Sequence, residues 1–242
     1  MDGLTVIAVD WSGRAGAEQV HAIRAAVVPP GGPVEVWADL RREDVVGELL
    51  DIGGPVVVGL DFSFGFPAWV GEWHGCASGP ELWPLVARDG EDWIARCPPP
   101  FYGRAGTRAP AVPLRRVTER EAGAKPTFLL AGGGHVGTAS LRGMPFLAAL
   151  RAAGYAVWPF DDAAGRTAVE IYPASLRAAA GAPELPRRVA RAVANSPDTR
   201  DAVLSALVMA RHRERLASLR AATDPVTRLE GAIWLPAVAA GP

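Results

Sequence analysis

The stretch Leu4-Thr5-Val6-Ile7-Ala8-Val9-Asp10-Trp11-Ser12-Gly13 decides the fold of this 242-residue chain. A short, continuous apolar run without alternating polar residues is typical of a strand that is buried on both faces of a sheet. Asp10 follows at the end of that strand, where a lone buried carboxylate would be costly. We therefore expect a cation or a cage of hydrogen-bond donors to meet Asp10.

A second stretch, Pro55-Val56-Val57-Val58-Gly59-Leu60-Asp61, repeats the pattern of a buried apolar run that ends in an acid. Residues 19–28 and 34–37 lie between the two runs and are predicted to be strands joined by a proline- and glycine-rich turn. The usual right-handed crossover would return the second run parallel to the first. Adjacent strands lie about 4.8 Å apart, so Asp10 and Asp61 are expected at the same edge of the sheet.

The remaining segments are predicted to alternate helices with strands around a less regular middle. Residues 62–140, in which tryptophans and prolines follow no regular period, are interpreted as an inserted cap or loop segment within one domain that spans residues 1–242. The expected helices are 41–51, 145–153, 173–180, 187–194 and 198–222, and the further expected strands are 155–160 and 167–172.

The composition excludes several broad classes of protein. The net charge is −1, so no overall field attracts the chain to nucleic acid or to an anionic membrane, and Lys125 is the only lysine. No apolar run is long enough to span a bilayer and no signal peptide precedes Leu4, so a cytoplasmic location without a membrane partner is expected. Cys76 and Cys97 form no disulfide framework; with His74 they could supply three zinc ligands, but a fourth is not obvious.

Further acids can join Asp10 and Asp61. Glu170 lies in the predicted strand 167–172, and Asp198 and Asp201 lie three residues apart on one predicted helix. Asp201 falls on the apolar side of that helix and should point toward the sheet, whereas Asp198 alone is better explained by the helix dipole. Clustered carboxylates repel one another unless a cation holds them, and such oxygen-rich sites suit Mg²⁺ or Mn²⁺ rather than zinc.

The order of these motifs resembles that of the predicted nucleases of domain-of-unknown-function family 429, in the ribonuclease H-like superfamily. The resemblance covers most of the chain and is weakest over residues 68–112. The segments that carry it are Asp10-Trp11-Ser12-Gly13, Gly59-Leu60-Asp61-Phe62-Ser63-Phe64-Gly65, Arg116-Val117-Thr118-Glu119, Gly137-Thr138-Ala139-Ser140-Leu141-Arg142-Gly143-Met144-Pro145, Val169-Glu170-Ile171-Tyr172-Pro173 and Asp198-Thr199-Arg200-Asp201-Ala202.

The resemblance implies an α/β, ribonuclease H-like fold with a mixed five-stranded sheet in the order 3-2-1-4-5, flanked by helices. It also implies phosphodiester hydrolysis by two divalent metal ions, with Asp10 bridging them. The implied substrate is a nucleic acid or a nucleotide, and a homodimer remains open. The implied catalytic and metal-binding residues are Asp10, Asp61, Glu170 and Asp201, with Asp198 as a further ligand, and the candidate substrate contacts are Ser12, Arg116, Lys125 and His135.

Two other functions remain open from the sequence. One is a non-catalytic scaffold of the same fold that binds only a nucleotide or an ion. The other is a dinucleotide-binding protein, because Gly132-Gly133-Gly134-His135-Val136-Gly137 satisfies G-x-G-x-x-G after the strand-like Thr127-Phe128-Leu129-Leu130, with Asp161 near the place of a ribose-binding acid. Against the second, Pro145 predicts that the following helix starts too late for this fingerprint.

Overall fold

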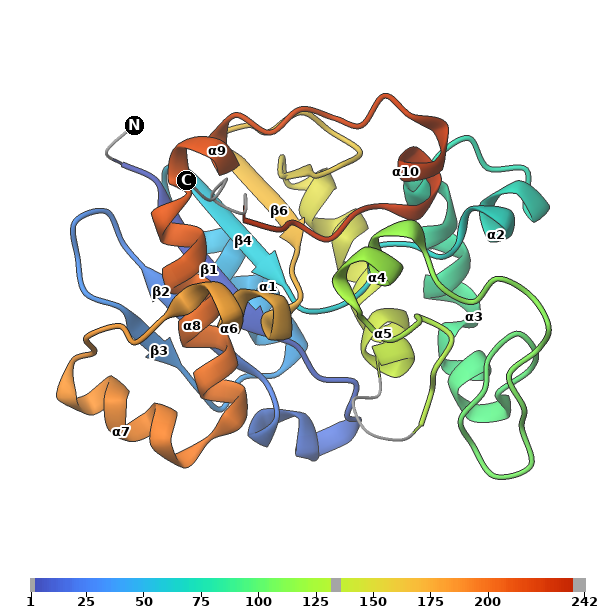
Figure 1. Cartoon of the computed structure of the whole chain (residues 1–242), viewed down its shortest axis with the longest axis horizontal. Coiled ribbons are helices and arrows are strands. Elements are labelled where there is room, and N and C mark those ends of the chain that lie inside the picture. Colours follow the sequence, from blue (N-terminus) through green and yellow to red (C-terminus); the bar gives the residue numbers. More distant parts are fainter. Residues whose placement is uncertain (1–2, 132–135, 237–242) are drawn as a thin grey trace.

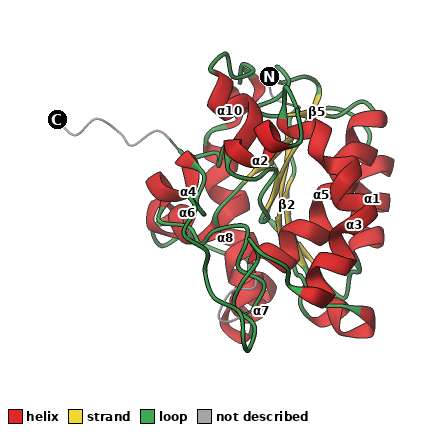
Figure 2. Cartoon of the chain, turned by 90° about the vertical axis from the view of Figure 1, so that its right-hand side faces the viewer, coloured by secondary structure: helices red, strands yellow, loops and turns green. Residues whose placement is uncertain are grey.

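The computed structural model describes residues 3–131 and 136–236 and shows an α/β chain with one mixed six-stranded sheet between two layers of helices (Figures 1 and 2). The order of strands across the sheet is β3-β2-β1-β4-β6-β5. The strands are β1 (Thr5–Asp10), β2 (Arg24–Val28), β3 (Glu35–Trp37), β4 (Val56–Leu60), β5 (Ala156–Val157) and β6 (Arg166–Glu170).

The two apolar runs form the centre of the sheet, as predicted. Strand β1 pairs with β4 in parallel, in a register that sets Val9 beside Leu60, and β4 pairs with β6 in parallel. Strand β2 runs antiparallel to β1. Both central strands are buried on both faces, which explains why their sequences are continuously apolar.

The predicted five-stranded sheet is one strand short. The order 3-2-1-4 is confirmed, but β6 lies next to β4 and the two-residue β5 lies outside it. Strand β5 stops at Val157 because Pro159, two residues later, has no backbone N–H to donate to a neighbouring strand. The expected strand 19–28 is also shorter, since a 3₁₀ turn, η1 (Gly16–His21), precedes β2.

Each face of the sheet packs against its own set of helices (Figure 2). Helices α1, α3 and α5 share one core with Ile7 and Val9 of β1, and helices α6, α7 and α8 share the other with Val6 and Ala8. The helices are α1 (Arg42–Asp51), α2 (Ala68–Trp73), α3 (Trp83–Arg96), α4 (Val117–Ala122), α5 (Val136–Ala152), α6 (Pro173–Ala180), α7 (Arg187–Asn195), α8 (Pro197–Arg211), α9 (Arg213–Ala217) and α10 (Pro225–Glu230), with a second 3₁₀ turn, η2 (Gly79–Leu82).

Helices α1, α6 and α7 lie where the sequence predicts them, and two other helices differ. Helix α5 begins at Val136, not at Pro145, and continues through that proline because Met144, Leu147 and Leu150 are buried and hold the turns on either side of it. The long helix expected over 198–222 ends at Arg211, where α8 gives way to the short α9.

The middle of the chain contributes helices to the main core. Trp83, Val86 and Ile94 of α3 belong to the same buried cluster as Ile7 and Val9 of the sheet. In residues 3–131 and 136–236, no helix has both the length and the apolar character needed to cross a lipid bilayer.

Two helical glycines provide a matched test of this packing. A Cβ at Gly143 of α5 would lie 2.6 Å from the Phe62 ring, whereas a Cβ at Gly47 of α1 would meet no atom within 4 Å. We expect Gly143→Ala to lower the free energy of unfolding by about 1–3 kcal/mol through overpacking. Gly47→Ala should raise it by about 0.5–1 kcal/mol, because alanine favours the helix. Urea unfolding of both variants measures this, and equal effects would contradict the packing of Phe62 against α5.

Candidate functional site

Asp10 and Asp61 lie side by side at one edge of the sheet. Asp10 is the last residue of β1 and Asp61 follows β4 directly, and the backbone N–H of Asp61 donates to the carbonyl oxygen of Val9 at 3.1 Å. The parallel register therefore fixes both carboxyl groups at the same level. Neither carboxyl group accepts a hydrogen bond from any residue in the described part of the chain, so no cage of donors compensates them.

The electrostatic surroundings disfavour charge on both groups. Burial, followed by the proximity of Asp61, raises the pKa of Asp10 to about 9, and Asp198 and Asp201 add to this effect. Burial and the proximity of Asp201 and Glu170 raise the pKa of Asp61 to about 8. Arg177 opposes both shifts but does not cancel them. Strongly perturbed carboxyl groups in a cleft are characteristic of functional sites.

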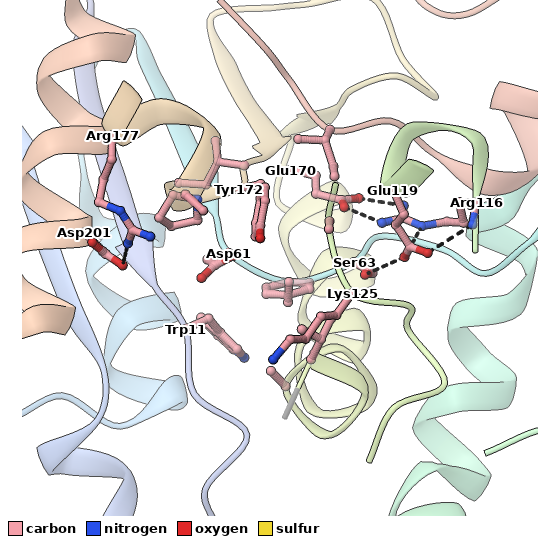
Figure 3. A pocket seen from close by; sticks show the side chains of 18 residues that line it. Trp11, Asp61, Ser63, Arg116, Glu119, Lys125, Glu170, Tyr172, Arg177 and Asp201 are labelled. Atoms are coloured by element: carbon pink, nitrogen blue, oxygen red, sulfur yellow. Dashed lines mark hydrogen bonds and ion pairs between the residues drawn. The ribbon is translucent and has the colours of Figure 1, made fainter. Parts of the chain in front are cut away.

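Asp201, on helix α8, lies close to Asp10 and Asp61. Its carboxylate accepts a hydrogen bond from Arg177 of α6, while its Oδ1 is buried and has no hydrogen-bond partner. Figure 3 shows this pair to one side of Asp61. Asp198 lies in the first turn of α8, close enough to Asp10 to raise the pKa of that carboxyl group.

Two cavities meet at these acids. The first, which we call the acidic groove, measures about 690 Å³ and is lined by residues that include Asp10, Ser12, Glu18, Asp61, Asp198 and Asp201. The second, the inner pocket, measures about 240 Å³ and is lined by residues that include Trp11, Phe62, Lys125, Ile171, Tyr172 and Arg177. Trp11, Asp61, Ala139 and Asp201 line both cavities, so the acids stand between an open groove and a smaller pocket.

The structure places Glu170 in an ion pair that the sequence did not predict. Its carboxylate accepts hydrogen bonds from both terminal nitrogens of Arg116, at 2.9 and 2.5 Å, and from the backbone N–H of Phe64 at 2.9 Å. Both side chains are almost fully buried. Arg116 neutralises this carboxylate in the structure, so the role of Glu170 as a catalytic metal ligand stays a prediction.

The guanidinium of Arg116 is held by acids of the protein, so its role as a substrate contact stays a prediction. Its side chain is fully buried, and Glu119 accepts from its Nε at 2.8 Å, as expected for a structural ion pair. Burial alone would lower the pKa of Arg116, but the neighbouring carboxylates of Glu170 and Glu119 raise it above its usual range. This guanidinium joins α4 to the end of β6 and is a structural crosslink.

Of the other predicted substrate contacts, two lie at the cavities. Ser12 lines the acidic groove, where its hydroxyl accepts from the backbone N–H of Arg14 at 3.1 Å. Lys125 lines the inner pocket. His135 lies outside the described residues, so its role stays a prediction.

The metal site expected from the sequence is not preassembled. Within the residues that the structure describes, no group of three or more His, Cys, Asp or Glu side chains is placed to hold a metal ion. Cys76, Cys97 and His74, the zinc alternative, are among these described residues and form no such group either. What the fold provides instead is the Asp10–Asp61 pair, with Asp201 beside it but bound to Arg177.

The dinucleotide alternative loses its preceding strand. Residues 132–134 of the glycine-rich motif lie outside the described residues, but Thr127-Phe128-Leu129-Leu130 forms no strand of the sheet and contributes only an isolated bridge from Leu129 to Tyr102. Asp161, the proposed ribose ligand, instead pairs with Arg151 and accepts from Val157 N. The late helix start that argued against this alternative is wrong, because α5 begins at Val136.

Sequence reasoning did not single out Trp11, Tyr172 or Arg177 as parts of the site. The sequence did contain a signal for Tyr172 and Arg177. Tyr172-Pro173 comes shortly after strand β6, which ends at Glu170, and opens helix α6 at the same edge of the sheet. No family model, no curated protein and no solved structure matches the chain. The resemblance to family 429 and the ribonuclease H-like fold therefore stay predictions.

The raised pKa values of Asp10 and Asp61 predict how stability depends on pH in the absence of divalent cations. Between about pH 4 and the folded-state pKa values of about 8 to 9, the folded chain retains protons that the unfolded chain releases. Stability should therefore fall as the pH rises through this window, by up to about 1.4 kcal/mol per pH unit for each retained proton.

Thermal unfolding of the wild type and of Asp61→Asn, measured in a chelator from pH 5 to 9, tests this pH dependence. The variant should be the more stable protein at pH 8, by about 1–3 kcal/mol, because it removes an uncompensated buried charge. Parallel pH profiles for the variant and the wild type would contradict the assignment.

Glu170→Gln should destabilise the protein, in contrast to Asp61→Asn, because it leaves Arg116 buried with one carboxylate fewer. We expect a loss of about 3–5 kcal/mol in the free energy of unfolding, measured by urea titration. The matched control is Glu91→Gln, which weakens the ion pair of the exposed Glu91 with Arg142 and should cost less than about 1 kcal/mol. Stabilisation by Glu170→Gln would show that Glu170 belongs with the uncompensated acids.

Proposed function

We propose that this chain is a divalent-metal-dependent hydrolase of phosphodiester bonds, a nuclease or phosphodiesterase, with Mg²⁺ or Mn²⁺ held by Asp10, Asp61 and Asp201. One observation carries the proposal: adjacent parallel strands hold two carboxyl groups together, and no donor from the described residues compensates them. Protons can neutralise these groups in the absence of a ligand, and a bound cation would compensate them in the charged form. Such a cation would allow both groups to ionise at neutral pH.

The residues present fit Mg²⁺ or Mn²⁺ in two respects. The side chains at the junction of the two cavities offer carboxylate oxygens only, which is the donor set that these hard cations prefer. Asp201 Oδ1 is buried and accepts no hydrogen bond from the described residues, with Arg200 Nε 3.9 Å away, so it keeps a lone pair for a cation. Asp198, in the first turn of α8, lines the acidic groove and adds negative charge to it.

Each residue of the site has a distinct part in the proposed reaction. A bound divalent cation lowers the pKa of a water molecule and offsets the negative charge of a phosphodiester. Asp10 and Asp61 would hold the cation as carboxylates, and Asp201 would join them if its ion pair with Arg177 opened. Arg177, whose side chain is 38% exposed, is then available to the anionic substrate at the mouth of the inner pocket.

Cation binding tests the proposal first. In calorimetry and thermal shift at pH 7.5, Mn²⁺ and Mg²⁺ should bind and stabilise the wild type, by about 2.7 kcal/mol at a hundred times the dissociation constant. Asp10→Asn and Asp61→Asn should abolish the effect. The control is Glu18→Gln, at the rim of the acidic groove, which should leave cation binding unchanged within about threefold.

Incubation with single-stranded and double-stranded DNA, RNA and small nucleotides in Mn²⁺ then tests catalysis. Cleavage should require the cation and both aspartates. Cation binding without cleavage of any of these substrates would favour the non-catalytic ion- or nucleotide-binding scaffold. Wild-type protein that binds neither Mn²⁺ nor Mg²⁺ would overturn the proposal.

A further inference from the structure

The inner pocket contains a buried hydrogen-bond donor that no described residue satisfies. Trp11 is only 6% exposed, and its Nε1 has no hydrogen-bond partner among residues 3–131 and 136–236. The indole N–H can only donate, and leaving such a group buried and unpaired costs about 1–3 kcal/mol. The ring itself is held by Phe62, with ring centroids 5.0 Å apart, and by Phe146 at 5.8 Å. An acceptor supplied by a ligand would satisfy this donor.

A positive group faces the same space. Figure 3 shows the indole nitrogen of Trp11 and the ammonium group of Lys125 directed into the same part of the inner pocket, below Asp61. Val136 and Ala139, from the first turn of α5, line the pocket as well. The amino end of a helix carries partial positive charge. Four acids also line this cavity: Asp61, Glu119, Glu170 and Asp201. Arg116 pairs with Glu119 and Glu170, and Arg177 pairs with Asp201, so the donors of Trp11 and Lys125 next to the amino end of α5 favour an anion there.

The rest of the pocket has room for more than the anion. Its volume is about 240 Å³, and Phe62, Ile171 and Ile233 line it with apolar surface. Tyr172 directs its hydroxyl into the pocket from above (Figure 3). The pocket is continuous with the acidic groove through Asp61 and Asp201, so an anion in it lies next to the proposed cation site.

We propose that the inner pocket binds the phosphate group of the substrate, with Trp11 Nε1 and Lys125 Nζ donating to its non-bridging oxygens and the attached organic group lying against Phe62 and Tyr172. Phosphate suits two donors that approach from different residues, because it offers several oxygens around one centre. The assignment makes Trp11 and Lys125 substrate-binding residues. It rests on the proposed function, since the same phosphate would face the cation held by the aspartates.

Binding of inorganic phosphate and of thymidine 5′-monophosphate to the metal-free protein tests this inference separately from catalysis. Calorimetry in a chelator at pH 6 should detect both ligands, with the nucleotide binding more tightly because of the apolar walls. Trp11→Phe, which keeps the ring and removes the N–H, and Lys125→Met should each weaken binding at least tenfold. Lys125→Arg should restore binding to within threefold of the wild type.

Trp93→Phe is the matched control, because Trp93 packs against Phe101 away from the inner pocket. It should leave phosphate binding unchanged. Lys125 is exposed, so Lys125→Met carries the test even if Trp11→Phe fails to fold. Acetate that binds as tightly as phosphate, or phosphate binding that neither Trp11→Phe nor Lys125→Met weakens, would overturn the inference.

The two proposals fail in different ways. Cation binding at the aspartates without phosphate binding at Trp11 would overturn only the assignment of the inner pocket. Phosphate binding that depends on Trp11 and Lys125, in a protein that binds neither Mn²⁺ nor Mg²⁺, would support the pocket and overturn the metal-dependent hydrolase. In an active enzyme, Trp11→Phe should raise KM at least fivefold and change kcat less.

Discussion

The parallel pairing of β1 with β4 is the constraint on which the rest of the site depends. The register that sets Val9 beside Leu60 leaves no freedom for the next residues, Asp10 and Asp61, to avoid one another. Parallel strands end at the same edge of a sheet, and neighbouring strands are about 4.8 Å apart. The hydrophobic burial of two central strands thus holds together two acids whose charges repel. Stability alone would favour asparagine at either position.

A second group of buried acids shows how this chain neutralises carboxylates that serve its structure. Glu119 and Glu170 surround the fully buried Arg116, and every terminal nitrogen of the guanidinium has a partner. Glu230 completes the arrangement by accepting from the backbone N–H groups of Ala68 and Val117. This network joins the end of β6 to α4 and α10. Figure 3 shows it beside the Asp61 site, where no such compensation is provided.

The contrast separates two kinds of buried acid in one protein. Breaking a fully paired ion network is costly because it leaves an uncompensated charge, so its members are best explained by stability. An acid that stays unpaired near a cleft is best explained by a ligand that binds there. Asp201 lies between the two kinds, since Oδ2 accepts from Arg177 whereas Oδ1 is buried, accepts no hydrogen bond from the described residues and lies 3.9 Å from Arg200 Nε. Arg177 is the counter-charge of Asp201 in the structure and also lines the inner pocket.

The sequence by itself determined the centre of the sheet and the position of its two acids. Continuous apolar runs that end in Asp10 and Asp61 specify doubly buried parallel strands, and this local signal does not depend on the rest of the chain. The sequence likewise predicted helices α1, α6 and α7 from breakers and periodicity.

Only the tertiary structure decided which acids are neutralised. Arg116 and Glu170 are 54 residues apart, and no local pattern indicates that they meet. The same holds for Trp11, whose unpaired N–H becomes apparent only when the walls of the inner pocket are in place. Helix α5 passes through Pro145 because packing outweighs the local preference of proline for a helix start. Long-range burial sets the partners of charged groups, and that information is absent from spacing along the chain.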